Sequence, residues 1–167
     1  IRNEISASDH ELEAQKFMET DYYRYWDALL KDERLIRYIE ENDLQIIFYP
    51  HREMHRFLKY FHVDHPKITV ASWPEYDVQT LLKESAVLVT DFSSVAMDFA
   101  YMKKPVLYTQ FDKEEFFGGE HVCTAGYFDY ERDGFGEASA FMSSRPTRSA
   151  GMRPSKPSPA PARICAT

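Results

Sequence analysis

Hydrophobic positions along the chain follow two alternating periods. In the first forty residues, apolar side chains recur at helical spacing among acidic and aromatic ones. This region predicts helices over about residues 9–42, with Thr20 and Asp32 as N-caps, because short oxygen-bearing side chains accept hydrogen bonds from the first free N–H groups of a helix. Beyond it, short apolar runs typical of buried strands alternate with helical segments.

The strands expected after residue 43 are apolar on both faces, and helical segments separate them. This pattern is typical of a parallel sheet covered by helices. The sequence therefore predicts an α/β, Rossmann-like fold. Strands are expected at 44–49, 68–71, 86–90 and 105–108, and helical segments at 54–61, 78–83 and 94–102.

Three parts are expected along the chain. Residues 1–43 form a helical lead-in packed on the sheet, and residues 44–136 form the Rossmann-like nucleotide-binding domain. Residues 137–167 contain five of the nine prolines, six serines and one aromatic residue, Phe141. Such a composition provides little apolar surface to offset the entropy of ordering. This last segment is therefore predicted to be low-complexity and disordered.

Charge and composition narrow the class of function. The net charge is −7, and residues 137–167 carry five basic residues against Glu137, a net +4, so the first 136 residues carry −7 − 4 = −11. An acidic body argues against non-specific nucleic-acid binding. No apolar run approaches the length of a membrane span or forms a secretory leader. The two cysteines, Cys123 and Cys165, lie far apart in unlike surroundings, which fits a reducing, cytoplasmic compartment.

The segment with the clearest chemistry is the expected strand that ends in Thr90 and Asp91. It turns through Ser93 and Ser94 into a helix. Ligands of open α/β sheets bind at the carboxyl ends of strands, and a helix start offers N–H groups to an anion such as a diphosphate. Asp98, one turn further on, has a carboxylate suited to a ribose diol. The alternative is that a serine only caps the helix and Asp98 is a solvated polar residue.

His51 and Arg52 follow the carboxyl end of another expected strand. They would therefore lie at the same ligand rim, where both can contact phosphate. His51 and His55 are four residues apart, as in zinc-binding helices, but the glutamate between them stands in neither position that the zincin motifs use. No metal site is predicted.

Several motifs together resemble one known family. These motifs occur in the same order as in that family and at nearly the same spacing, and they cover about residues 18–136. They lie at residues 48–51, 76–85, 90–95, 98–105, 110–112 and 126–136. The chain resembles the CDP-glycerol glycerophosphotransferases of teichoic-acid-type polymer synthesis. This resemblance implies the C-terminal half of a GT-B architecture.

The resemblance also implies a reaction. A hydroxyl of a lipid-linked polyol-phosphate polymer attacks the β-phosphorus of CDP-glycerol, and CMP is released without a cofactor. It implies that His51, Ser93 and Ser94 hold the diphosphate and that Asp98 lies at the ribose, while Asp91 is expected to fix the serine turn. The catalytic base is expected in an N-terminal domain outside this sequence, so the chain alone is expected to be inactive. In the intact protein the site would lie at the inner face of the plasma membrane.

The resemblance stops just after Gly136, where the Ser- and Pro-rich segment begins. A shifted reading frame, a gene break or a natural low-complexity tail would each produce this change. Two other functions stay open: a GT-B glycosyltransferase or epimerase fragment that uses a nucleotide sugar, and a non-catalytic nucleotide-binding or interaction remnant. The sequence leaves open which polymer is built and whether glycerol or ribitol phosphate is transferred.

Overall fold

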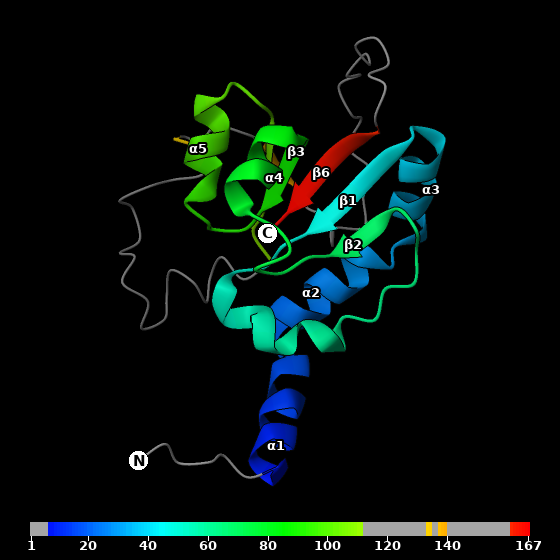
Figure 1. Ribbon diagram of the computed structural model, residues 1–167, viewed down its shortest axis with the longest axis vertical. Helices are drawn as coiled ribbons and strands as arrows, with labels where there is room; N and C mark the ends of the chain where they lie inside the picture. Colours follow the sequence, from blue (N-terminus) through cyan, green and yellow to red (C-terminus); the bar gives the residue numbers. More distant parts are fainter. Residues whose placement is uncertain (1–6, 112–132, 135–136, 140–160) are drawn as a thin grey trace.

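The computed structural model describes residues 7–111, 133–134, 137–139 and 161–167. In these residues, six parallel strands form one sheet in the order β2-β1-β6-β3-β4-β5, with helices on both faces (Figure 1). The α/β, Rossmann-like prediction is confirmed, and the architecture is consistent with one half of a GT-B enzyme. The strands are β1 (Leu44–Phe48), β2 (Ile68–Val70), β3 (Ser85–Thr90), β4 (Val106–Thr109), β5 (Glu137–Ser139) and β6 (Ala162–Ala166).

The helices begin where short polar side chains cap them. Thr20 accepts a hydrogen bond from the Tyr23 N–H at the start of α2, and Asp32 accepts from Arg34 and Leu35 at the start of α3. Both caps were predicted, and both are confirmed. The helices are α1 (Ala7–Met18), α2 (Asp21–Leu30), α3 (Glu33–Glu41), α4 (Val78–Glu84) and α5 (Val95–Tyr101), with the 3₁₀ helix η1 (Arg52–Tyr60) between β1 and β2.

The sheet separates two apolar clusters. On one face, Trp26 of α2 and Ile39 of α3 are fully buried against Phe48 of β1. On the other face, Phe99 of α5 is fully buried with Leu88 of β3, and α4 packs beside them. Adjacent residues of one strand pack in opposite clusters, as expected because successive side chains of a strand point to opposite faces of the sheet. The helical region before residue 44 therefore packs on the sheet through its aromatic and aliphatic side chains.

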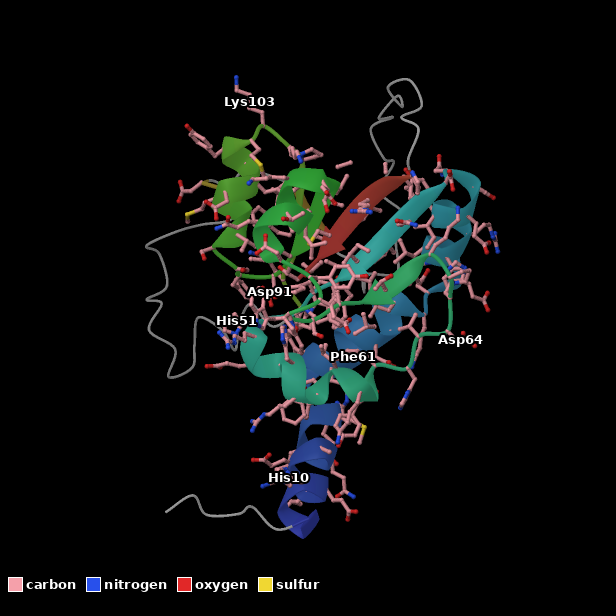
Figure 2. The ribbon with its side chains drawn as sticks, viewed as in Figure 1. His10, His51, Phe61, Asp64, Asp91 and Lys103 are labelled. Atoms are coloured by element: carbon pink, nitrogen blue, oxygen red, sulfur yellow. The ribbon has the colours of Figure 1, made fainter. Side chains whose placement is uncertain are left out.

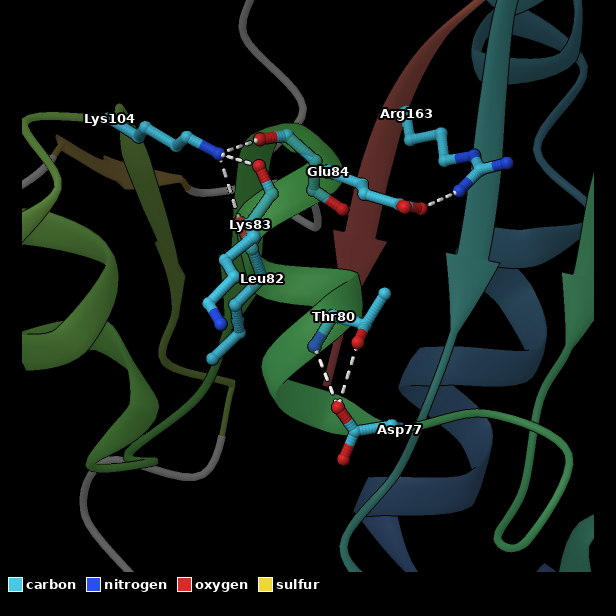
Figure 3. A network of polar contacts seen from close by, with 8 residues as sticks. Asp77, Thr80, Leu82, Lys83, Glu84, Lys104 and Arg163 are labelled. Atoms are coloured by element: carbon cyan, nitrogen blue, oxygen red, sulfur yellow. Dashed lines mark hydrogen bonds and ion pairs between the residues drawn. The ribbon is translucent and has the colours of Figure 1, made fainter.

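Polar contacts fix α4 at both ends (Figure 3). Asp77 caps its first turn by accepting from the N–H and the hydroxyl of Thr80, each at 2.9 Å. At the other end, the Lys104 ammonium donates to the carbonyl oxygens of Leu82 and Ser85 at 3.0 and 2.8 Å. A lysine from the loop before β4 thus satisfies carbonyls that the end of a helix leaves without partners.

The C-terminal segment corrects one prediction. Ala162–Ala166 form β6, which pairs with β1 on one side and β3 on the other, and Glu137–Ser139 form β5 at the sheet edge. The expectation of disorder across residues 137–167 is therefore wrong for these two stretches, and residues 140–160 lie outside the described chain. A composition averaged over 31 residues conceals a five-residue window with four small or apolar side chains, and the backbone of this window pairs with a strand on each side.

Candidate functional site

Parallel strands place their carboxyl ends at one edge of the sheet. Tyr49 to His51 follow β1, Asp91 follows β3, Gln110 follows β4 and Thr167 follows β6. The predicted residues His51, Thr90 and Asp91 therefore lie at the same edge, and Figure 2 shows His51 and Asp91 on the same side of the molecule. In open α/β sheets this edge is where ligands bind.

Threonines at this edge hold the ends of three strands together. Thr90 is fully buried, and its hydroxyl lies 3.0 Å from that of Thr167. The Thr109 hydroxyl donates to the Thr90 carbonyl oxygen at 3.2 Å, and the Thr167 N–H donates to the Val89 carbonyl oxygen at 2.9 Å. The Thr90 side chain, predicted at the ligand site, is thus placed to fix the geometry of the edge.

Asp91 comes directly after this buried layer and is half-buried. Tyr22 of α2 lies near it: burial raises the pKa of the Tyr22 phenol well above its usual value, and the negative charge of Asp91 raises it further. The Tyr22 ring packs against Trp26 and Phe111, with centroids 6.4 Å away in each case. Helix α2 therefore borders the candidate site. No local sequence pattern connects Tyr22 with Asp91.

The serine turn leads into α5 as predicted. Ser94 is the N-cap residue, but its side chain makes no capping hydrogen bond. The alternative that this serine only caps the helix is therefore not supported for Ser94. Its hydroxyl is exposed and makes no hydrogen bond to the helix backbone. Helix α5 has only seven residues, so its dipole contributes little to the electrostatic field at its start. Asp98 is exposed on the first turn of α5.

His51 and Arg52 are exposed at the end of β1, where the buried Pro50 leads into η1. His51 is the N-cap residue of η1, and its Nδ1 accepts a long hydrogen bond of 3.4 Å from the Glu53 N–H. This bond is made by Nδ1 and holds the exposed imidazole beside the first turn of η1. Sequence reasoning placed His51 at the rim but did not anticipate its capping role.

The sequence assigned no role to the Gln110 side chain, although it belonged to one of the family-like motifs. Its Nε2 amide is buried and has no hydrogen-bond partner in the described part of the chain. Buried polar groups are normally paired, so this amide at the carboxyl end of β4 is a candidate donor to a ligand. The motif at 110–112 was the signal that pointed to it.

Other ionisable residues are engaged elsewhere. His65 pairs with Glu40 at 3.2 Å, and His55 Nε2 lies 3.1 Å from the Pro50 carbonyl oxygen. Among the described residues, no group of three His, Cys, Asp or Glu side chains has the arrangement of a metal site. Within the same residues, no helix combines the length and the apolar character needed to cross a bilayer.

Comparison with known proteins gives matches in sequence. The chain is 38% identical over 124 residues to the minor teichoic acid biosynthesis protein GgaB of Bacillus subtilis, which covers 73% of this chain and 13% of that protein. It is 29% identical over 87 residues to the teichoic acid ribitol-phosphate polymerase TarK of Staphylococcus aureus, which covers 50% of this chain and 16% of that protein. The chain thus spans a small part of the curated relatives it matches. No solved structure matches it significantly.

A family match covers most of the described strands and all of the predicted site residues. Residues 13–142 match the family described as CDP-Glycerol:Poly(glycerophosphate) glycerophosphotransferase. This range contains β1 to β5, the serine turn and the rim at His51. The resemblance found in the sequence is confirmed by this match and by both relatives. The chain belongs to the CDP-glycerol:poly(glycerophosphate) glycerophosphotransferase family.

Proposed function

We propose that this chain forms the donor-nucleotide part of a transferase that moves glycerol phosphate from CDP-glycerol to a growing teichoic-acid-type polymer. The family match over residues 13–142 carries this proposal, and the relative GgaB, named for minor teichoic acid biosynthesis, supports it. The relative TarK is named as a ribitol-phosphate polymerase, which makes a CDP-linked ribitol phosphate the natural competing donor.

The proposed reaction is a phosphoryl transfer. A hydroxyl oxygen of the polymer attacks the β-phosphorus, and the bond from that phosphorus to the bridging oxygen breaks. CMP takes the electron pair, and the hydroxyl proton passes to a base outside the residues described here. In such reactions, catalysis depends on alignment and on stabilisation of charge on the phosphate oxygens.

In the proposal, residues at the carboxyl edge of the sheet align the donor and stabilise the charge on its phosphates. Arg52 and His51 at the end of β1 and the hydroxyls of Ser93 and Ser94 after β3 hold the diphosphate. Asp98 accepts hydrogen bonds from the ribose. Asp91 does not face the phosphates directly, since two negative charges would repel, and instead fixes the serine turn.

The partners follow from the same chemistry. The acceptor is a lipid-linked polyol-phosphate polymer, so the intact enzyme would act as a peripheral protein at the inner face of the plasma membrane. In this proposal, parts of the protein outside this sequence supply the acceptor side and the catalytic base. This is compatible with the small share of the relatives that the chain spans. This chain alone is therefore expected to bind the nucleotide but to release no CMP.

Calorimetric titration of CDP, CMP and cytidine tests the assignment. Ser93→Ala combined with Ser94→Ala removes two donors to a charged group, each worth about 1.5–3 kcal/mol, so CDP affinity should fall at least about tenfold. The matched control is Ser155→Ala with Ser158→Ala in the Pro- and Ser-rich segment. Cytidine binding should change little in either double variant. An equal loss of cytidine and CDP binding would show that the serines support the fold and do not contact the phosphates.

The ribose assignment has its own control. Asp98→Ala should weaken CDP, CMP and cytidine alike, because all three contain the ribose. Asp64→Ala removes an exposed carboxylate far from Asp91 and His51 (Figure 2) and should leave all three affinities unchanged. A selective loss of CDP binding in Asp98→Ala would overturn the ribose role.

A further inference from the structure

One exposed aromatic side chain of the described residues lies at the ligand-binding edge of the sheet. Trp73 follows β2 by three residues and is 57% exposed. The other large apolar side chains that are exposed in the described part of the chain lie on α1, α3 and α5 or within β4. Single exposed apolar residues are common on protein surfaces. The position of Trp73, and not its exposure alone, therefore points to a role.

The loop that contains Trp73 runs along the carboxyl edge. It leaves the carboxyl end of β2 and enters α4 after Asp77. Helix α4 ends directly before the amino end of β3 and packs on β3 and β6, so its own first turn lies towards the carboxyl edge. Figure 1 shows the loop joining β2 to α4 on the side of the sheet where β1 ends. Residues 71–77 thus pass from the outer strand towards the central strands, where the nucleotide is proposed to bind.

Backbone hydrogen bonds hold this loop in place. The Ala71 N–H donates to the Phe48 carbonyl oxygen of β1 at 2.8 Å. The Tyr76 N–H donates to the Ser72 carbonyl oxygen at 3.0 Å and closes the turn that contains Trp73. A side chain on a backbone that is already ordered loses less conformational entropy when it binds a ligand. The indole is therefore presented from a fixed turn.

The loop after β1 approaches the same region. Burial and the negative charge of Asp77 raise the pKa of the Tyr49 phenol, and the positive charge of Arg52 offsets part of this increase. The phenol therefore lies near the start of α4 and near the rim residue to which a phosphate contact is assigned. Trp73 follows the neighbouring strand, since β2 pairs with β1 at a spacing of about 4.8 Å. The indole thus lies beside the proposed phosphate rim.

The flat face of an indole suits the aromatic base of a nucleotide. Aromatic rings of this kind stack in offset arrangements, and stacking on a base requires no particular pattern of hydrogen bonds. We propose that Trp73 stacks on the cytosine base of the nucleotide that binds at the carboxyl edge. This inference rests on the proposed function. It adds a contact to the base, whereas the residues assigned above contact only the phosphates and the ribose.

Tryptophan fluorescence of the unchanged chain tests the proposal. The chain has two tryptophans, and Trp26 is fully buried, so quenching by a bound ligand reports mainly on Trp73. CMP and cytidine should quench the emission when indole is excited at wavelengths that cytosine does not absorb. Ribose 5-phosphate should not, because it lacks the base. The quenching should disappear in Trp73→Phe, which leaves Trp26 as the only indole.

Calorimetry measures what the contact contributes to affinity. Trp73→Ala should weaken the binding of CMP and cytidine at least about fivefold, as expected for the loss of one ring that stacks on a base. Trp73→Phe should retain most of the affinity, because a phenyl ring can still stack. Tyr38→Ala is the matched control: this side chain is 56% exposed on α3, which precedes the amino end of β1. Its loss should leave both affinities unchanged.

The outcomes separate this inference from the proposed function. CMP binding without quenching, equal quenching by ribose 5-phosphate, or unchanged affinity in Trp73→Ala would overturn the stacking and leave the proposed function in place. A chain that binds neither CMP nor cytidine would overturn both. The quenching measurement uses the unchanged chain, so it does not depend on the folding of a variant.

Discussion

The contact between Thr90 and Thr167 gives the sharpest test of the carboxyl edge. Thr90→Val keeps the shape and the β-branch of the side chain but removes the hydroxyl that lies 3.0 Å from the Thr167 hydroxyl. A hydrogen bond of this kind contributes about 0.5–1.5 kcal/mol to stability. Thr90 is fully buried, whereas Thr167 is half-buried and can bind water after the change. The expected loss in the free energy of unfolding is therefore about 1 kcal/mol, with a fall in Tm of about 2–4 °C.

A double-mutant cycle separates the contact from other effects of the substitutions. Thr90→Val, Thr167→Val and the double variant are unfolded in urea, and the fluorescence of the buried Trp26 reports the transition. The coupling energy should be about 1 kcal/mol. Thr80→Val, at the exposed start of α4, provides the control and should be additive with Thr90→Val within about 0.5 kcal/mol. A Thr90–Thr167 coupling no larger than this control would refute the pairing of β6 with β3 at this edge.

Three further changes should affect stability in defined ways. Lys104→Met removes the ammonium that donates to the carbonyls at the end of α4, so the free energy of unfolding should fall by about 1–3 kcal/mol in urea. Leu88→Ala should cost about 2–5 kcal/mol because the side chain is fully buried, while Leu107→Ala on the exposed side of β4 should cost much less in the same assay. Hydrogen bonds hold the pKa of the Asp32 and Asp77 carboxyls below the usual value, so their stabilisation is complete above the unfolded pKa of about 4 and is lost as the pH falls through the folded pKa. Asp32→Asn and Asp77→Asn keep a capping oxygen, and the Tm of each should fall less steeply than that of the parent between about pH 5 and pH 3.

Local sequence signals predicted most of the sheet and the position of the site. Thr20 and Asp32 could be identified as caps because each stands directly before a run of helical spacing. The strand that ends at Thr90 could be identified because it is continuously apolar and leads into small polar residues. Because parallel strands end at one edge of a sheet, and His51 and Asp91 each follow the carboxyl end of an expected strand, both could be predicted to lie at the same edge.

Longer-range contacts could not be predicted in this way. The five residues of β6 have no strong strand pattern of their own, and their conformation depends on two partners far away in sequence. The approach of Tyr22 to Asp91 likewise depends on how α2 lies across the sheet. The capping role of His51 depends on the 3₁₀ form of η1, which helical spacing alone did not distinguish from an α-helix.

The alternation within β1 restricts how this part of the chain can change in length. Ile46 and Phe48 are buried in one cluster and Ile47 in the other. Deletion or insertion of one residue between Leu44 and Phe48 would shift the residues on one side of the change by one register position and turn their side chains to the wrong cluster. Natural variants and designed chimeras should therefore accept only apolar substitutions of similar volume within β1, and changes in chain length should be confined to surface connections such as residues 62–66.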